Sequence, residues 1–562
     1  MLAAALAQSA PDRLGPKPAL ALTGDSLNQT MKMKPLPDSI TAVARPSLWL
    51  WAGACLALAQ FHGSALAQGS LTPPGPPGPT MKTLQQIEPR TPIGSLPFTI
   101  SAPGSYYLTT NLTGVGGASG ITITTNDVTL DLRGFKLAGV PGSLHGILAS
   151  GSLQNVSVAN GTVSAWGTNG VTADSTSSSQ FSGLRLMNNG ADGLESGHRA
   201  LVRQCVAEGN SGNGFGGFCS ECIFDHCAAN NNNGEGFSTY EKCLLLGCTA
   251  NDNGLDGFNP FFDCTVRDCN ANNNGFDGID IPYPGCLVTH CVCNVNGVQG
   301  IQGGDDSAVR DSVATANNGD GIVTGVRCVI GACTATANLG SGITTSNDCT
   351  LTACTASANQ LDNVDTGYGC ALSECSADNS VTGSGFSLAA ANTLTASCAF
   401  SNSVYGVDAG DRSTVQSCTA SFNGVAGIHV NLLGTVRQCT SVNNGTYGIL
   451  SDFNGYATIV ENTCSFNGLL TPSGTPTQGA GIWITNSPGC RIEANTLNLN
   501  YVGLVVAPNS HAFVLRNSAQ NSVSAAYAIG TGNSWGPIVN VSSSGDISAV
   551  PNANHPAANF IH

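Results

Sequence analysis

Acidic side chains that could bind a cation recur at one position of a regular pattern. Glu235, Asp256 and Asp277 each directly precede a glycine, and they follow one another at intervals of 21 residues. In a chain that repeats its conformation with this period, their Cα atoms lie about 4.8 Å apart in a line. Carboxylates this close raise one another's pKa values or bind a cation, and Ca²⁺ prefers such oxygen ligands. Asp-Gly steps also form good turns at a solvated edge, which is the simpler interpretation. We therefore predict no resident cofactor, with Ca²⁺ at these three acids as the alternative.

Aromatic side chains accompany the acids in the same phase. Tyr240 and Phe261 come four residues after the pattern glycine of successive repeats, and Phe262 and Tyr283 come five residues after it. Exposed, stacked rings beside acidic groups provide a platform for a sugar ring. Packing of the rings on one another to cover a corner is the alternative. The predicted ligand-binding residues are Glu235, Tyr240, Asp256, Phe261, Phe262, Asp277, Asp280, Tyr283, Asp305 and Asp306.

The pattern glycine is followed by an aliphatic residue or Phe, and this pair recurs through most of the chain. Every step from Gly193 to Gly448 is 21 or 22 residues when Asn363 is counted in the one slot without glycine. Asn recurs four residues before the glycine, where stacked amides can form a ladder of hydrogen bonds. Tetratricopeptide, ankyrin and propeller repeats are all longer. The predicted fold class is all-β: a single-stranded right-handed parallel β-helix, a solenoid of about 18 coils of 21–22 residues with N- and C-terminal caps.

Cysteines form two further columns in phase with the glycine. A spacing of five residues lets both thiols face the interior only if a corner separates them, at pairs such as Arg267-Asp268. We interpret the columns as stacked, buried thiols, with disulfides or a metal site as alternatives. Cys219 and Cys293 lie off the columns and are the predicted reactive thiols. The pairs are Cys222/Cys227, Cys243/Cys248, Cys264/Cys269, Cys286/Cys291, Cys328/Cys333, Cys349/Cys354 and Cys370/Cys375, and the second column is expected to continue at Cys398, Cys418, Cys439 and Cys464.

The N-terminal residues indicate export. An apolar stretch over residues 48–59 follows basic residues, and small residues at 65–67 suit a cleavage site. A short helix at 81–92 with Met81, Leu84 and Ile87 on one face would cover the first coil. The predicted organisation is an upstream extension with a secretory signal peptide (1–67), a Pro/Gly-rich linker (68–80), an N-terminal cap (81–120), the β-helix (120–520) and a C-terminal cap (521–562). We expect a bacterial protein that is secreted, extracellular or on the cell surface.

The charge of the chain excludes some partners. Without residues 1–67 it has 32 acidic and 15 basic side chains, and residues 186–325 hold 17 of those acids. A chain of this charge does not bind nucleic acid or an anionic membrane through its overall field. We predict no nucleic-acid partner, no membrane span and, because of the caps, a monomer. A polysaccharide is the expected partner.

Several segments resemble the bacterial right-handed β-helix repeat proteins, in the broad group of carbohydrate-binding proteins and sugar hydrolases. The matching steps are NNNGFDGIDI and NNGTYGIL, together with the opening coil FTISAPGSYYLTTNLTG. The resemblance covers about residues 93–520. It implies the fold but leaves the function open, because this fold carries lyases, hydrolases, epimerases, adhesins and binding proteins.

If the resemblance extends to enzymes of the polygalacturonase type, it implies clustered Asp residues followed by Gly-His-Gly and Arg-x-Lys motifs. Asp277 with Asp280 looks like the first Asp motif, and Asp305 with Asp306 looks like the second. Asp305 follows Asp277 by 28 residues, however, which places it on a different part of the coil, and neither later motif follows. We therefore predict a non-catalytic extracellular β-helix that binds or displays glycans. A polysaccharide lyase or glycoside hydrolase with an atypical site and a purely structural surface rod are the alternatives.

Overall fold

The computed structural model describes residues 87–452, 455–469, 479–543 and 545–562. The predicted signal peptide and linker, and Met81 and Leu84 of the predicted helix, lie outside the described residues. Nearly every element is a β-strand, and one short 3-10 helix, η1 (Ile547–Ala549), lies near the C-terminal end. In the part of the chain that is described, no helix is long and apolar enough to cross a membrane.

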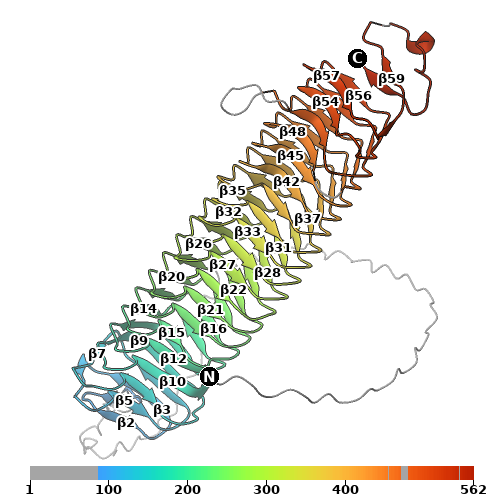
Figure 1. Cartoon of the computed structure of the whole chain (residues 1–562). Coiled ribbons are helices and arrows are strands. Elements are labelled where there is room, and N and C mark those ends of the chain that lie inside the picture. The colour runs from blue at the N-terminus through green and yellow to red at the C-terminus, as the bar shows by residue number, and fades with distance from the viewer. Residues whose placement is uncertain (1–86, 453–454, 470–478, 544) are drawn as a thin grey trace, which may run out of the picture. The chain divides into compact units, whose positions relative to one another are not determined.

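Each regular coil consists of three short strands. One coil contains β18 (Phe237–Thr239), β19 (Leu244–Leu246) and β20 (Thr249–Asn251), and the next contains β21 (Phe258–Pro260), β22 (Thr265–Arg267) and β23 (Asn270–Asn272). Each strand pairs in parallel with the strand one coil further on, for example β18 with β21 and β19 with β22. The coils therefore stack along one axis, as Figure 1 shows from β2 to β57. The predicted right-handed parallel β-helix is confirmed.

The first strand of each coil belongs to a 20-stranded sheet, called sheet B below, and the other two belong to a 40-stranded sheet, sheet A. The described residues make about 21 turns, slightly more than the 18 predicted. The strands of sheet B are β2 (Phe98–Ile100), β5 (Ile121–Ile123), β8 (Ile147–Ala149), β10 (Val171–Ser177), β12 (Leu194–His198), β15 (Phe215–Gly216), β18, β21, β24 (Ile279–Ile281), β27 (Ile301–Gly303), β30 (Ile322–Thr324), β33 (Ile343–Thr345), β36 (Val364–Thr366), β39 (Phe386–Leu388), β42 (Tyr405–Ala409), β45 (Ala426–Val430), β48 (Tyr447–Ser451), β51 (Ala480–Ile484), β54 (Val502–Val506) and β57 (Ala525–Ile529).

Strands also occur in the segments predicted as caps. The strand β1 (Thr91–Ile93) lies within 81–120 and pairs with β3 (Gly104–Leu108). Beyond β57 the chain forms β58 (Ser534–Trp535), β59 (Ile538–Asn540), η1 and β60 (Asn559–Ile561). Phe560 there packs against a small separate cluster of buried apolar residues. The boundaries between caps and β-helix stay predictions.

The interior is filled by side chains that stack from coil to coil. In the three-residue strands of sheet B the first and third residues are buried and the middle residue faces outward. The rings of Phe215, Phe237 and Phe258 stack in this way, with 4.9 Å between the centroids of neighbouring rings. Burying such rings in register stabilises neighbouring coils against each other and fixes the register between them.

Stacked asparagines form the predicted ladder. Asn253 Nδ2 donates to Asn274 Oδ1 and to the backbone oxygen of Ala229, both at 3.0 Å. The buried amide thus satisfies both of its donors. The ladder also explains the glycine in phase with it, because a Cβ on Gly257 would lie 2.7 Å from Asn274 Nδ2.

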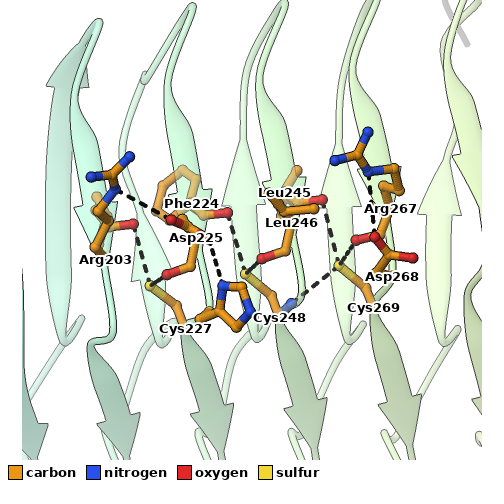
Figure 2. Close-up of polar contacts among 12 residues, drawn as sticks. Arg203, Phe224, Asp225, Cys227, Leu245, Leu246, Cys248, Arg267, Asp268 and Cys269 are labelled. Atoms are coloured by element: carbon orange, nitrogen blue, oxygen red, sulfur yellow. Dashed lines mark hydrogen bonds and ion pairs between the residues drawn. The ribbon is translucent and has the colours of Figure 1, made fainter. Parts of the chain in front are cut away.

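The cysteine columns are buried free thiols in the structure. Figure 2 shows Cys227, Cys248 and Cys269 on successive coils of sheet A. The predicted corner is confirmed, since Asp268 has a φ of 56° between β22 and β23. Each Sγ lies within hydrogen-bonding distance of backbone oxygens, as Cys248 does with Phe224 and Leu246 at 3.5 and 3.4 Å.

Two cysteines were assigned to the second column wrongly. Cys398 is exposed within β41 (Cys398–Phe400), and Cys464 lies in the middle of β50 (Thr463–Ser465). The column position is taken instead by Ser397 and Asn462, whose side-chain oxygens accept from the backbone N–H groups of Cys375 and Cys439. Cys398 is displaced by one residue along the strand, which exchanges the inner and outer faces, whereas Cys464 is displaced by two residues and stays buried at another inward position.

Candidate functional site

The predicted ligand-binding residues gather where β18, β21 and β24 present their outward face. In register with one another, Ser238 and Asn259 occupy the outward positions of β18 and β21. Phe258 pairs with Ile279, so Asp280 follows Asn259 on the next coil. The turns that precede these strands carry Glu235, Asp256 and Asp277. Sheet B therefore brings these four acids to one side of three successive coils.

Glu235, Asp256 and Asp277 each use one carboxylate oxygen to hold the neighbouring coil. Asp256 Oδ1 accepts from the backbone N–H of Asp277 at 2.8 Å, and Asp277 Oδ1 accepts from that of Gln299 at 2.6 Å. Glu235 Oε1 accepts from Asn259 Nδ2 at 2.9 Å. The acids thus satisfy donors of the following coils, as the turn-forming interpretation predicts.

The remaining oxygens are unusual for buried groups. Glu235 Oε2, Asn259 Oδ1 and Asp280 Oδ1 are inaccessible to solvent and have no hydrogen-bond partner among the described residues. Buried acceptors without a donor cost free energy. A proton held within the cluster, or a small cation between the carboxyl groups, would satisfy these oxygens.

The four acids of this cluster have raised pKa values. Burial, followed by the charges of Asp256, Asp277 and Glu235, raises the pKa of Asp280 to about 7. Burial also raises the pKa of Asp277 to about 6, and that of Glu235 and Asp256 above the usual range. At neutral pH part of this cluster therefore carries protons and can donate as well as accept hydrogen bonds.

The predicted aromatic residues form a continuous row. Ring centroids lie 5.7 Å apart for Tyr240 and Phe261, 4.8 Å apart for Phe261 and Tyr283, and 4.3 Å apart for Phe262 and Tyr283. The rings do pack on one another, as the alternative interpretation has it. They also stay partly exposed, with Tyr240 at 39%. Both features suit a surface on which a sugar ring could stack.

A cavity of about 260 Å³ adjoins the start of this row. Tyr240 and Phe261 line one side of it, and Asp174, Glu195 and the strongly exposed Phe218 contribute to the rest. Burial, followed by the charges of Asp192 and Asp174, raises the pKa of Glu195 to about 7. These last three residues were not predicted from the sequence. Glu195 could have been found, because it follows Gly193 by two residues as Asp280 follows Gly278.

The two remaining predicted residues, Asp305 and Asp306, have contacts with other parts of the chain than the acidic cluster. Asp305 lines a separate cavity of about 450 Å³ beside β24 and β27, and its Oδ1 accepts from the backbone N–H of Val326. Asp306 is exposed and forms a two-point ion pair with Arg327, with both distances at 2.7 Å. This pairing lowers the pKa of Asp306.

A second polar cluster on sheet B escaped the sequence analysis. His429 on β45 lies between two carboxylates, with Nδ1 2.7 Å from Asp408 Oδ1 and Nε2 2.8 Å from Asp452 Oδ1. Tyr405 stacks on the imidazole with 4.8 Å between centroids. Asp408 and His429 occupy the same outward position two residues after the pattern glycine as Asp280, which is the signal that could have revealed them.

The fold and its repeated ladders define the class of this chain: it is a parallel β-helix repeat protein. A family model described as "Periplasmic copper-binding protein (NosD)" matches residues 359–546, about a third of the chain. No curated protein matches the sequence.

Among solved structures, the A-module of a mannuronan C-5 epimerase from Azotobacter vinelandii matches with 14% identity and a TM-score of 0.25, covering 64% of this chain and 86% of that one. The catalytic domain of a GH87 α-1,3-glucanase matches with 12% identity and a TM-score of 0.24, covering 79% and 64%. A tailspike protein of an E. coli bacteriophage matches with 12% identity and a TM-score of 0.26, covering 78% and 72%. These values support no assignment of activity.

The copper named in the family description can be tested against the donors of the matched segment. Copper is bound by cysteine sulfurs and histidine nitrogens. Among the described residues of 359–546, no three His, Cys, Asp or Glu side chains bring their ligand atoms close enough to share an ion. Both nitrogens of His429 already face carboxylates. The described residues of the matched segment therefore do not fit a copper ion.

Proposed function

We propose that this chain is a non-catalytic glycan-binding protein that holds an extracellular polysaccharide against sheet B between Glu195 and Tyr283. The observation that carries the proposal is the row of partly exposed rings from Tyr240 to Tyr283 beside a line of acidic side chains. Sugar rings present apolar faces that stack on such rings and hydroxyl groups that form hydrogen bonds with acidic groups.

The direction of the row suits a polymer. The row passes from β18 to β24 along the stacking axis, at about 4.8 Å per coil. A linear glycan chain that follows the axis would contact rings and acids on each coil in turn. The expected location is outside the cytoplasm, in agreement with the predicted signal peptide and with the periplasmic family that matches residues 359–546.

Hydrolysis or elimination is the second candidate function. It is favoured by Glu195, whose carboxyl group, with a pKa of about 7, lines the cavity together with Asp174 and could serve as a general acid. Glu195 cannot act with Asp280 on one bond, because four coils at about 4.8 Å place them about 19 Å apart, against 5–9.5 Å in glycosidases. An enzyme would therefore need both of its carboxyl groups close together, either near Glu195 or near Asp280.

Calcium is the alternative to a site without a cofactor. Asp256 and Asp277 each keep a second carboxylate oxygen after their backbone contacts, and Glu235 has an unpartnered oxygen. Titration of the full chain with Ca²⁺ by calorimetry, followed by Asp256→Asn, tests this. Heat that disappears in the variant would establish the ion, and absence of heat in the natural chain would exclude it.

The main experiment is a binding assay of the full chain against neutral and uronic-acid polysaccharides by affinity electrophoresis. The variant Phe261→Ala/Tyr283→Ala should lose retardation. The control is Phe400→Ala/Phe422→Ala, a pair of exposed rings with centroids 5.4 Å apart on other coils. Equal binding by both variants would contradict the proposal. Reducing ends or unsaturated uronides released by the natural chain, and lost in Glu195→Gln, would instead establish the second candidate.

A further inference from the structure

Three buried thiols meet at one point of the interior. The Sγ atoms of Cys219, Cys222 and Cys243 all lie within 4.8 Å of one another, and all three residues are at most 2% exposed. No other three His, Cys, Asp or Glu side chains in the described ranges come this close. Cys219 was predicted to be a reactive thiol because it lies off the columns, but it is fully buried beside a column.

A column of cysteines alone does not produce such a group. Figure 2 shows that Cys227, Cys248 and Cys269 follow one another in a line. Each thiol of a line has close neighbours only one coil away, so close contacts arise in pairs. Cys222 and Cys243 are one such pair, and Cys219, only three residues before Cys222, completes a triangle.

The backbone departs from the repeat to bring Cys219 inside. The strand β15 has only two residues, Phe215 and Gly216, where its neighbour β18 has three. Gly217 follows with a φ of 108°, and a Cβ there would lie 2.6 Å from the backbone oxygen of Ser196. This conformation requires glycine, so the local sequence Gly-Gly-Phe-Cys is matched to the inward position of Cys219.

The three thiols have polar groups close to them, unlike the rings of the apolar core. Cys222 Sγ accepts from the backbone N–H of Ala200 at 3.3 Å. Ser196 Oγ and Thr239 Oγ1 are buried without a hydrogen-bond partner.

We propose that Cys219, Cys222 and Cys243 form a binding site for a soft, thiophilic metal ion, with Cu(I) as the ion that fits best. Thiolate ligands select Cu(I) and Zn²⁺ among the common metals. Zn²⁺ in structural sites takes four ligands, whereas Cu(I) is satisfied by three sulfurs, which is the number present. Sulfurs bound at about 2.3 Å to one ion lie about 4 Å apart, so the three need to move little.

Binding of Cu(I) at this site requires no redox step. Each thiol that coordinates as thiolate releases its proton to solvent, and the ion stays Cu(I) throughout. Gly217, two residues before Cys219, and Thr239, four residues before Cys243, line the cavity of about 260 Å³. The site does not depend on the proposed glycan function. It also lies outside residues 359–546, so the family match gives it no support.

The test is an anaerobic titration of the reduced full chain with Cu(I) alone, with bicinchoninate as competitor. The natural chain should bind one equivalent that Cys219→Ser loses and Cys333→Ser keeps. Cys333 is an equally buried column thiol that is not part of the triangle. X-ray absorption of the loaded chain should show sulfur ligands only.

Two further measurements keep the result decisive. Circular dichroism of the metal-free variants shows whether each is folded, and a rise in Tm on adding Ag(I), absent in Cys219→Ser, gives a second readout of the same site. Equal stoichiometry in the natural chain and Cys219→Ser would overturn the proposal. So would a Cys219–Cys222 disulfide that persists in the purified chain under mild reductant.

Discussion

Asn363 Oδ1 accepts a hydrogen bond of 2.8 Å from Asn359 Nδ2. Asn363 occupies the position that holds glycine in other coils, yet its side-chain amide takes part in the asparagine ladder. Asn363 Nδ2 then donates to Asn402 Oδ1 at 2.9 Å, so the ladder continues. The ladder position of the coil between is Ser380, whose side chain has no amide. In other coils a Cβ at the glycine slot would collide with the next asparagine, as Gly342 would with Asn359 at 2.5 Å. The small Ser380 therefore leaves the room that Asn363 fills.

This exchange predicts a specific coupling between Asn363 and Ser380. Asn363→Gly alone should destabilise the chain by about 2 kcal/mol, because Asn359 Nδ2 loses an acceptor and Asn402 Oδ1 a donor in a buried position. Ser380→Asn alone should also destabilise it, because two amides then compete for one space. The double variant restores the regular glycine and asparagine pattern and should recover most of the stability. Urea midpoints of the four proteins measure the coupling, and strictly additive effects would contradict it.

The pair also shows what the sequence could predict. Glycine, asparagine and hydrophobic residues at a fixed period define a solenoid because each coil repeats the same contacts, and those features predicted the fold class. The predicted number of coils was too low because some coils have another residue at the glycine position. The coil after Gly503, for example, has Ala526 there. The substitution of Asn363 for glycine was visible in the sequence, but its link to Ser380 depends on side-chain positions in neighbouring coils.

The candidate site was predictable only in part, for a related reason. The period places Glu235, Asp256 and Asp277 in one line, and their charges add to the effect of burial in raising the pKa of Asp280. The period says nothing of contacts made by one residue alone, such as the ion pair of Asp306 with Arg327. Residues outside the pattern, including Phe218, escaped notice because no repetition marks them.

Asp280 should make the stability of the chain depend on pH. Its pKa is raised to about 7, above the unfolded value near 4, so the folded state holds a proton that the unfolded state releases between these values. The contribution to stability is thus fully present below about pH 4 and is lost as the pH rises through 7. Asp280→Asn should be more stable than the natural chain at pH 8, by on the order of 1 kcal/mol after allowing for partial exposure. Thermal melts from pH 4 to 8 measure this, with the exposed Asp311→Asn as control.

Asp306 was predicted to bind ligand, and its contacts now predict a negligible role. It is exposed and paired with Arg327, and exposed ion pairs contribute little to stability. Asp306→Ala should therefore leave the Tm nearly unchanged and should leave polysaccharide retardation equal to that of the natural chain. Loss of binding in this variant, with binding kept in Asp280→Asn, would move the binding surface from β24 toward β27.

His429 on β45 should give the chain a second pH dependence, separate from that of Asp280. Burial alone would lower its pKa, but the hydrogen bonds and charges of Asp408 and Asp452 outweigh burial and raise the pKa above its usual value. The imidazole is 6% exposed and the stacked ring of Tyr405 covers it. Because the folded state binds the proton more tightly than the unfolded state, this contribution is complete below the unfolded pKa of about 6.5 and is lost as the pH rises through the higher folded value.

The variant His429→Gln should therefore cost more stability at pH 5 than at pH 9, with the difference changing by on the order of 1 kcal/mol. Loss of packing on Tyr405 lowers stability equally at both values, so the change with pH isolates the charge. Asp452→Asn removes one of the two carboxylates and should shift the transition to lower pH while keeping the ring in place. Urea midpoints from pH 5 to 9 measure both effects. A cost for His429→Gln that is the same at every pH would mean that the imidazole is held neutral between the two acids.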